Sequence, residues 1–201
     1  MRFATSLIAF AIAFMPAVLK AQTPAPAAAT PPAPPMVLST TAFADGDDIP
    51  VRFSQAAPGA APGEGTSPAL TWTNVPAGTR SFVLHMHDVD VARNRGTETQ
   101  VHWLVWNIPA DATSLGEGLP RGAQLPNGAY QVSATGPVYR GPGAQATGPK
   151  HHYVFELYAL DRVVEVVPSE DAFATRRRVM EEIQGHVLGK AVYTGLFRRP
   201  Q

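Results

Sequence analysis

The chain has 201 residues, of which 45% are hydrophobic, and this predicts one domain with a substantial core. Its 16 basic and 16 acidic residues balance, so the charge does not favour electrostatic binding to nucleic acid or to an anionic membrane surface. The chain contains no cysteine, which excludes disulfides, thiolate metal ligands and thiol nucleophiles.

The N-terminal residues predict an export signal that is not part of the fold. "MRFATSLIAFAIAFMPAVLKA" begins with Arg2, continues through an apolar run and ends at the small residue Ala21, which is the layout of a signal peptide at 1–21. Pro16 interrupts the run, which disfavours a membrane anchor of about 20 apolar residues. We therefore expect cleavage after Ala21, a periplasmic or secreted location, and no integral membrane segment after cleavage.

The next segment is "QTPAPAAATPPAPP" at 22–35, which is rich in proline and alanine and predicts an extended linker. The folded domain is then expected at 36–201. Its first part gathers β-branched and aromatic residues in short runs separated by glycine, proline, asparagine and aspartate, as strands and turns require. The predicted strands span 36–43, 69–75, 80–89, 101–109 and 151–160.

The strand at 101–109 is expected in the centre of a sheet because both of its faces carry bulky side chains. Strict alternation predicts that His102 lies on the opposite face from Val101 and Trp103.

One helix is predicted late in the chain. Ser169 can cap its first turn, with Glu170 and Asp171 near the positive helix end. Gly189 is expected to end the helix before a last strand at 191–197. Apolar residues recur at helical spacing to form its inward face: Met180, Ile183, Val187 and Ala191.

Strands followed by a helix predict a mainly β fold, an antiparallel β-sandwich with a C-terminal helix. The arginines at 176–178 suggest a solvated helix face rather than a nucleic-acid patch.

The run "SFVLHMHDVD" ends in two histidines and two aspartates, and it leaves several site chemistries open. His85 and His87 are two residues apart and share a strand face, so with Asp88 they could bind a metal in a hydrolase. This alternative is the weaker one, because the spacing matches no helical zinc motif. Asp88 and Asp90 could perform acid–base chemistry on a sugar, although nothing fixes their separation.

A polar pocket for an anion is the alternative that we favour from the residues alone. Serine-triad and phosphate-loop motifs are absent from the sequence. Imidazole, tyrosine hydroxyl and the backbone N–H groups of a glycine-rich loop can donate to anion oxygens. Aspartates in such a pocket would accept the far N–H of a histidine and orient its other nitrogen.

Four segments, in order, carry a resemblance to a known family: "SPALTW" (67–72), "HDVDVA" (87–92), "VHWLVWNIP" (101–109) and "YRGPGAQATGPKHHYVFELYALD" (139–161). From about residue 36 to residue 197 the chain resembles the phosphatidylethanolamine-binding protein family, in its bacterial Raf-kinase-inhibitor-like branch. The resemblance implies a pocket for a phosphoryl head group, with no catalytic residue, no metal and no cofactor. Matched position by position, the ligand-binding residues are Asp88, Asp90, His102, Gly141, Pro142, His151 and Tyr153.

The expected function is therefore that of an exported binding protein, not an enzyme, for a phosphorylated or anionic small ligand such as a phospholipid head group. His102 is expected to donate to the ligand, and binding is expected to strengthen as the pH falls through about 6.5. His85 and His87 are expected to flank the pocket. The alternative is a protein-interaction or inhibitor module, with a protein partner and a vestigial pocket.

Overall fold

The computed structural model describes residues 33–201, and Ala33–Gln201 form one compact unit. The expected signal peptide at 1–21 lies outside the described residues, as does the expected linker except for 33–35. Between Ala33 and Gln201, no helix has the length and apolar character needed to cross a membrane.

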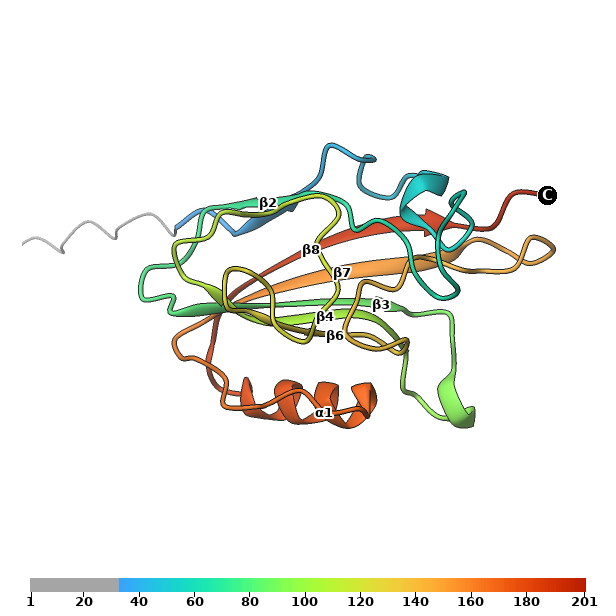
Figure 1. The fold of residues 1–201 in the computed structure, drawn as a ribbon. Helices are drawn as coiled ribbons and strands as arrows, with labels where there is room; N and C mark the ends of the chain where they lie inside the picture. The colour runs from blue at the N-terminus through green and yellow to red at the C-terminus, as the bar shows by residue number, and fades with distance from the viewer. Residues whose placement is uncertain (1–32) are drawn as a thin grey trace, which may run out of the picture. The chain divides into compact units, whose positions relative to one another are not determined.

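Two antiparallel sheets and a helix form three layers, with the larger sheet in the middle (Figure 1). The smaller sheet has the order β1 (Val37–Ser39), β2 (Leu70–Thr73) and β5 (Ser114–Leu115). The larger sheet has the order β6 (Tyr130–Val132), β4 (Gln100–Pro109), β3 (Ser81–Asp88), β7 (His151–Leu160) and β8 (Val187–Phe197). The helices are η1 (Val51–Phe53), η2 (Arg93–Arg95) and α1 (Ala172–Glu182).

This architecture confirms the predicted antiparallel β-sandwich with a C-terminal helix. Each predicted strand is present, while the two- and three-residue strands β5 and β6 were not predicted, because such short segments show no clear alternation.

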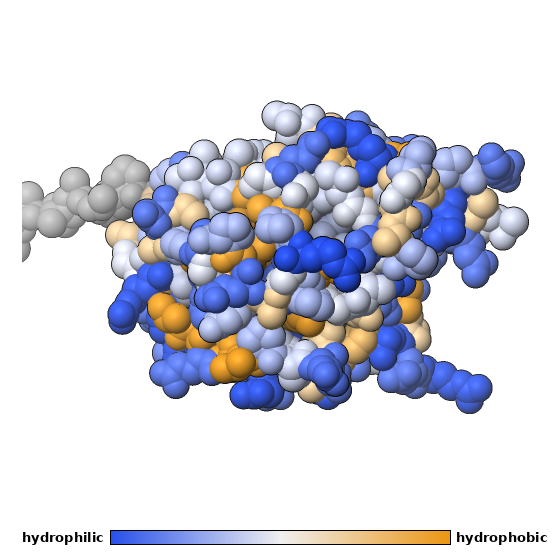
Figure 2. All heavy atoms as spheres, viewed as in Figure 1, coloured by the Kyte–Doolittle hydropathy of each residue, from blue (hydrophilic) through white to orange (hydrophobic). Residues whose placement is uncertain are grey.

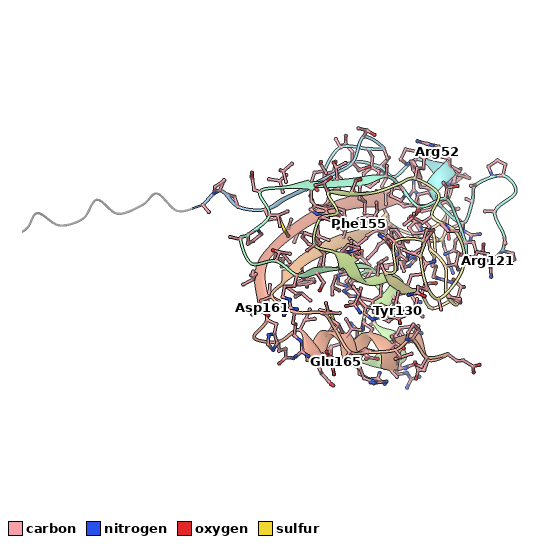
Figure 3. The ribbon with its side chains drawn as sticks, turned by 60° about the vertical axis from the view of Figure 1, so that its left-hand side comes forward. Arg52, Arg121, Tyr130, Phe155, Asp161 and Glu165 are labelled. Carbon is pink, nitrogen blue, oxygen red and sulfur yellow. The ribbon has the colours of Figure 1, made fainter. Side chains whose placement is uncertain are left out.

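Each face of the larger sheet buries its own core. Trp103 and Phe155 belong to the core between the two sheets, and Trp106 and Val179 belong to the core between the larger sheet and α1. Figure 3 shows Phe155 on the side of the smaller sheet and Tyr130 on the side of α1. Large exposed hydrophobic side chains remain, and on the face drawn in Figure 2 hydrophobic residues form small groups among hydrophilic ones.

The prediction that His102 and Trp103 lie on opposite faces is wrong. In the pairing of β3 with β4, Met86 is opposite Trp103 but His87 is opposite Val101, so His102 is an extra residue at a β-bulge. The bulge turns His102 to the same side as Trp103, where its ring lies edge-on to Tyr153 with the centroids 5.0 Å apart.

The predicted helix is too long at both ends. Its N-cap is Asp171, whose carboxylate accepts hydrogen bonds from two backbone N–H groups, rather than Ser169. The helix ends at Glu182, since Gly185 has a φ of +80° and reverses the chain. Val187 and Ala191 consequently lie in β8, outside the helix.

Candidate functional site

A cavity of about 440 Å³ opens where β3 ends and where β4 and β7 begin. Loops at 54–66 and 133–150 reach this same end of the sandwich, on the right in Figure 1. Polar groups from both loops and from the three strands line it: Gln55, Asp88, Gln100, His102, Arg140, Gln145, His151 and Tyr153.

Asp88 and His151 form a partly buried hydrogen-bonded pair on the cavity wall. Asp88 is the last residue of β3 and is 3% exposed. One carboxylate oxygen accepts from the backbone N–H of Asp90 at 3.0 Å, and the other contacts His151 Nδ1 at 2.8 Å. The pair thus has the orienting arrangement expected from the sequence, in which the carboxylate accepts from Nδ1–H and leaves His151 Nε2 for a ligand.

His102 lies on the cavity wall, but its protonation state differs from the expected one. Its Nδ1 contacts the carbonyl oxygen of Arg140 at 2.9 Å, and Nδ1–H is therefore the donor. Burial lowers the pKa of His102 to about 3, so the imidazole is neutral at physiological pH. This pKa disagrees with the expected proton gain near pH 6.5, and it leaves Nε2 able to accept a hydrogen bond rather than to donate one.

Tyr153 shapes the loop that closes one side of the cavity. Its hydroxyl oxygen accepts hydrogen bonds from the backbone N–H groups of Gly143 and Ala144, both at 3.1 Å. Burial raises the pKa of Tyr153 to about 12, so the hydroxyl keeps its proton.

Arg140 and Gln55 are cavity residues that sequence reasoning did not assign to the site. Arg140 lines the cavity, and the buried Nε of its side chain has no hydrogen-bond partner among the described residues. Nothing in the sequence marks Gln55, which lies far from the other wall residues along the chain.

Three of the seven predicted residues, Gly141, Pro142 and Asp90, do not line the cavity. They make hydrogen bonds that connect the segments around it. Gly141 accepts a hydrogen bond from the Gln55 side chain at 2.7 Å, and Pro142 accepts one from the Gln55 backbone at 2.9 Å. Asp90 accepts from the backbone N–H of His152 at 2.6 Å and so connects the end of β3 to the start of β7.

His85 and His87 lie on the opposite face of the larger sheet, toward α1. Their side chains approach Glu156 of β7, whereas Asp88 lies on the cavity side. The hypothetical metal site of His85, His87 and Asp88 is therefore not assembled. Burial lowers the pKa of His85 to about 4, so this imidazole is neutral.

The sequence of this chain is similar to those of known proteins. Residues 39–198 match the family described as phosphatidylethanolamine-binding protein. A UPF0098 protein of Methanothermobacter thermautotrophicus is 39% identical over 166 residues, which cover 82% of this chain and 99% of the relative. The UPF0098 protein YbhB of Escherichia coli is 33% identical over 164 residues, which cover 81% and 99%.

Solved structures of two bacterial proteins are also similar to this chain. The crystal structure of CT736 from Chlamydia trachomatis has a TM-score of 0.65 and 30% identity, covering 82% of this chain and 98% of that one. YbcL of E. coli has a TM-score of 0.62 and 25% identity, with the same coverage of 82% and 98%. The resemblance predicted from four short segments is confirmed, and the chain belongs to the phosphatidylethanolamine-binding protein family.

Proposed function

We propose that this protein is an exported binding protein, and that its cavity takes a small phosphorylated or otherwise anionic ligand, such as a phospholipid head group, without converting it. The observation that carries this proposal is the presence of Arg140 in the lining of a cavity of about 440 Å³. A cavity of that size suits a small molecule. Arginine is the side chain best suited to hydrogen-bond two oxygens of a phosphate or carboxylate at once.

The other wall groups add one donor and two acceptors. Tyr153 keeps a hydroxyl proton that it can donate to an anion, whereas His151 presents Nε2 as an acceptor, because its Nδ1–H donates to Asp88. His102 accepts through Nε2, so it complements a ligand that carries a donor, for example a singly protonated phosphate or an ammonium group.

Binding without turnover is the function that the protonation state of His102 supports. A general base works best when its pKa is near the working pH. Burial lowers the pKa of His102 to about 3, well below that range.

The proposal is tested by calorimetric titration of the purified protein with inorganic phosphate and with glycerophosphoethanolamine. Arg140→Gln should weaken binding about ten- to a hundredfold, because a hydrogen bond to a charged group contributes roughly 1.5–3 kcal/mol. His102→Ala should weaken it about fivefold, as expected for a neutral hydrogen bond of roughly 1 kcal/mol.

Arg177→Gln is the matched control, because Arg177 is an exposed arginine of α1 that pairs with Glu98. It should bind as the wild type does. If Arg140→Gln and Arg177→Gln lose affinity equally, the net charge of the protein causes the effect. Wild-type affinity in Arg140→Gln would refute the proposed site. Binding of both compounds with equal affinity would assign recognition to the phosphate alone.

A further inference from the structure

A second cluster of ligand-type side chains lies on the face of the larger sheet that packs toward α1. His85 and His87 project from β3 to this side, and Glu156 projects from β7, directly opposite His85 in the strand pairing. Successive side chains alternate across a sheet, so Met86 and Asp88 point to the other face, toward the sandwich core and the cavity. The cluster is therefore separate from the anion cavity.

The distances in this cluster are short enough for the three side chains to bind one metal ion. Glu156 Oε2 lies 3.5 Å from His85 Nδ1 and 3.4 Å from His87 Nε2. A tetrahedral ion with bonds of about 2.0–2.1 Å holds its ligand atoms roughly 3.3 Å apart. One ligand atom from each of the three residues lies within 4.8 Å of the others.

The nitrogens that face Glu156 have no hydrogen-bond partner. His85 is 2% exposed, and neither of its ring nitrogens makes a hydrogen bond within residues 33–201. The same is true of His87 Nε2. A buried polar atom without a partner destabilises the folded state, so such atoms are rare without a reason. A bound cation would remove this destabilisation at His85 Nδ1 and His87 Nε2.

Neighbouring groups orient two of the three side chains. His87 Nδ1 lies 2.8 Å from Thr99 Oγ1, and when Nδ1–H donates to this hydroxyl, Nε2 carries the free lone pair that a metal requires. Lys190 Nζ contacts the other carboxylate oxygen of Glu156 at 2.5 Å. The His87 and Glu156 side chains are 13% and 16% exposed, which gives an ion a route from solvent.

We propose that His85, His87 and Glu156 bind a divalent transition metal ion, with zinc as the best match. Two imidazoles and one carboxylate are a ligand set that zinc accepts, with a fourth position open to water. The second His-containing cluster, Asp88, Asp90 and His151, is a poorer candidate. There the Asp88–His151 contact of 2.8 Å is already a hydrogen bond, and both residues belong to the anion site.

The charges around the site set the expected affinity. Lys190 and Arg176 are cationic neighbours that oppose an incoming ion, but Lys190 is paired with Glu156 and Arg176 is paired with Glu98 at 3.2 Å. Because these two cations remain near the site, we expect tight binding only when all three ligands are present. Loss of any one ligand should lower the zinc affinity by more than about a hundredfold. Thr99→Val removes only the orienting hydroxyl and should lower it about ten- to a hundredfold.

The experiment uses the full chain without a polyhistidine tag, stripped of metal with a chelator and then titrated with Zn²⁺ against a chromophoric chelator. Co²⁺ is titrated in parallel, because its visible absorption reports the coordination geometry. The wild type should bind one equivalent of Zn²⁺ and give the absorption of a four-coordinate Co²⁺ site. His87→Gln, Glu156→Gln and His85→Gln should lose both signals.

His87→Gln and Glu156→Gln keep the test valid if the buried His85 variant fails to fold, and circular dichroism verifies the fold of each variant. The matched control is His186→Gln, which removes a histidine that lies outside both clusters and pairs with Asp161. It should bind zinc like the wild type. The proposal is overturned if the wild type binds no zinc, if the ligand variants bind it unchanged, or if His151→Gln abolishes binding while His87→Gln retains it.

Discussion

At the scale of single residues, burial decides the chemistry of His102. An exposed histidine titrates near neutral pH, but His102 is 2% exposed and its Nδ1 is hydrogen-bonded to the Arg140 carbonyl. The resemblance to a family motif assigned this imidazole to the ligand site, and the structure places it in the lining of the cavity. The resemblance could not predict the protonation state, because that depends on the surroundings and not on the residue type.

We predict that acid destabilises the protein partly through His102. The unfolded chain gains a proton on this residue below about pH 6.5, whereas the folded chain stays neutral down to about pH 3. Unfolding therefore takes up a proton between these values, and the free energy of unfolding falls as the pH falls. The contribution of one such group is about 1.4 kcal/mol per pH unit.

Urea unfolding at pH 7, 6 and 5 measures this slope. His102→Gln should have a shallower slope than the wild type by the contribution of about one proton. His186→Gln serves as the control and should keep the wild-type slope. Parallel curves for His102→Gln and the wild type would show that His102 is not the titrating group.

At the scale of elements, the cavity depends on a close approach of two loops. Gly141 packs so tightly that an added Cβ would lie 2.8 Å from the backbone carbon of Ser54 and 2.9 Å from the carbonyl oxygen of Glu64. Gln55 ties the same loops together through hydrogen bonds to Gly141 and Pro142. Glycine is needed at 141 because only a residue without a side chain leaves room for this contact.

Gly141→Ala should therefore separate the loops. We expect a loss of about 1–3 kcal/mol in the free energy of unfolding, as for other overpacked sites, together with weaker phosphate binding. Gly116→Ala is the matched control, because no atom lies within 4 Å of the position of its added Cβ. Thermal melts and calorimetric titration of both variants measure the difference. A Gly141→Ala protein as stable as Gly116→Ala would contradict the tight approach.

At the scale of the whole molecule, the larger sheet separates two groups of polar residues. The cavity proposed to bind an anion lies at one end of the core between the sheets, and the proposed metal site lies on the face toward α1. The two proposals can therefore be tested independently. His85→Gln should lose zinc and bind phosphate normally, and Arg140→Gln should do the reverse.

Export is the remaining prediction at this scale, and it rests on the sequence of residues 1–21. Mass spectrometry of the protein expressed in a bacterial host should find a mature form that begins near Gln22 in the periplasmic or secreted fraction. A variant with Leu7 and Leu19 changed to Arg should remain unprocessed, because charge interrupts the apolar run. A wild-type chain retained at full length in the membrane would contradict both the cleavage and the location.

The sequence by itself determined the fold class, the six strands β1, β2, β3, β4, β7 and β8, and four of the residues that line the cavity, namely Asp88, His102, His151 and Tyr153. These features follow from local patterns, namely alternation in strands, helical spacing, and short motifs in a fixed order. The tertiary structure decided which side chains meet. The bulge that turns His102 into the cavity, the approach of Arg140 and Gln55, and the position of Glu156 beside His85 and His87 all depend on the register between strands distant in the chain. That register comes from the packing of the whole sandwich, and no local pattern contains it.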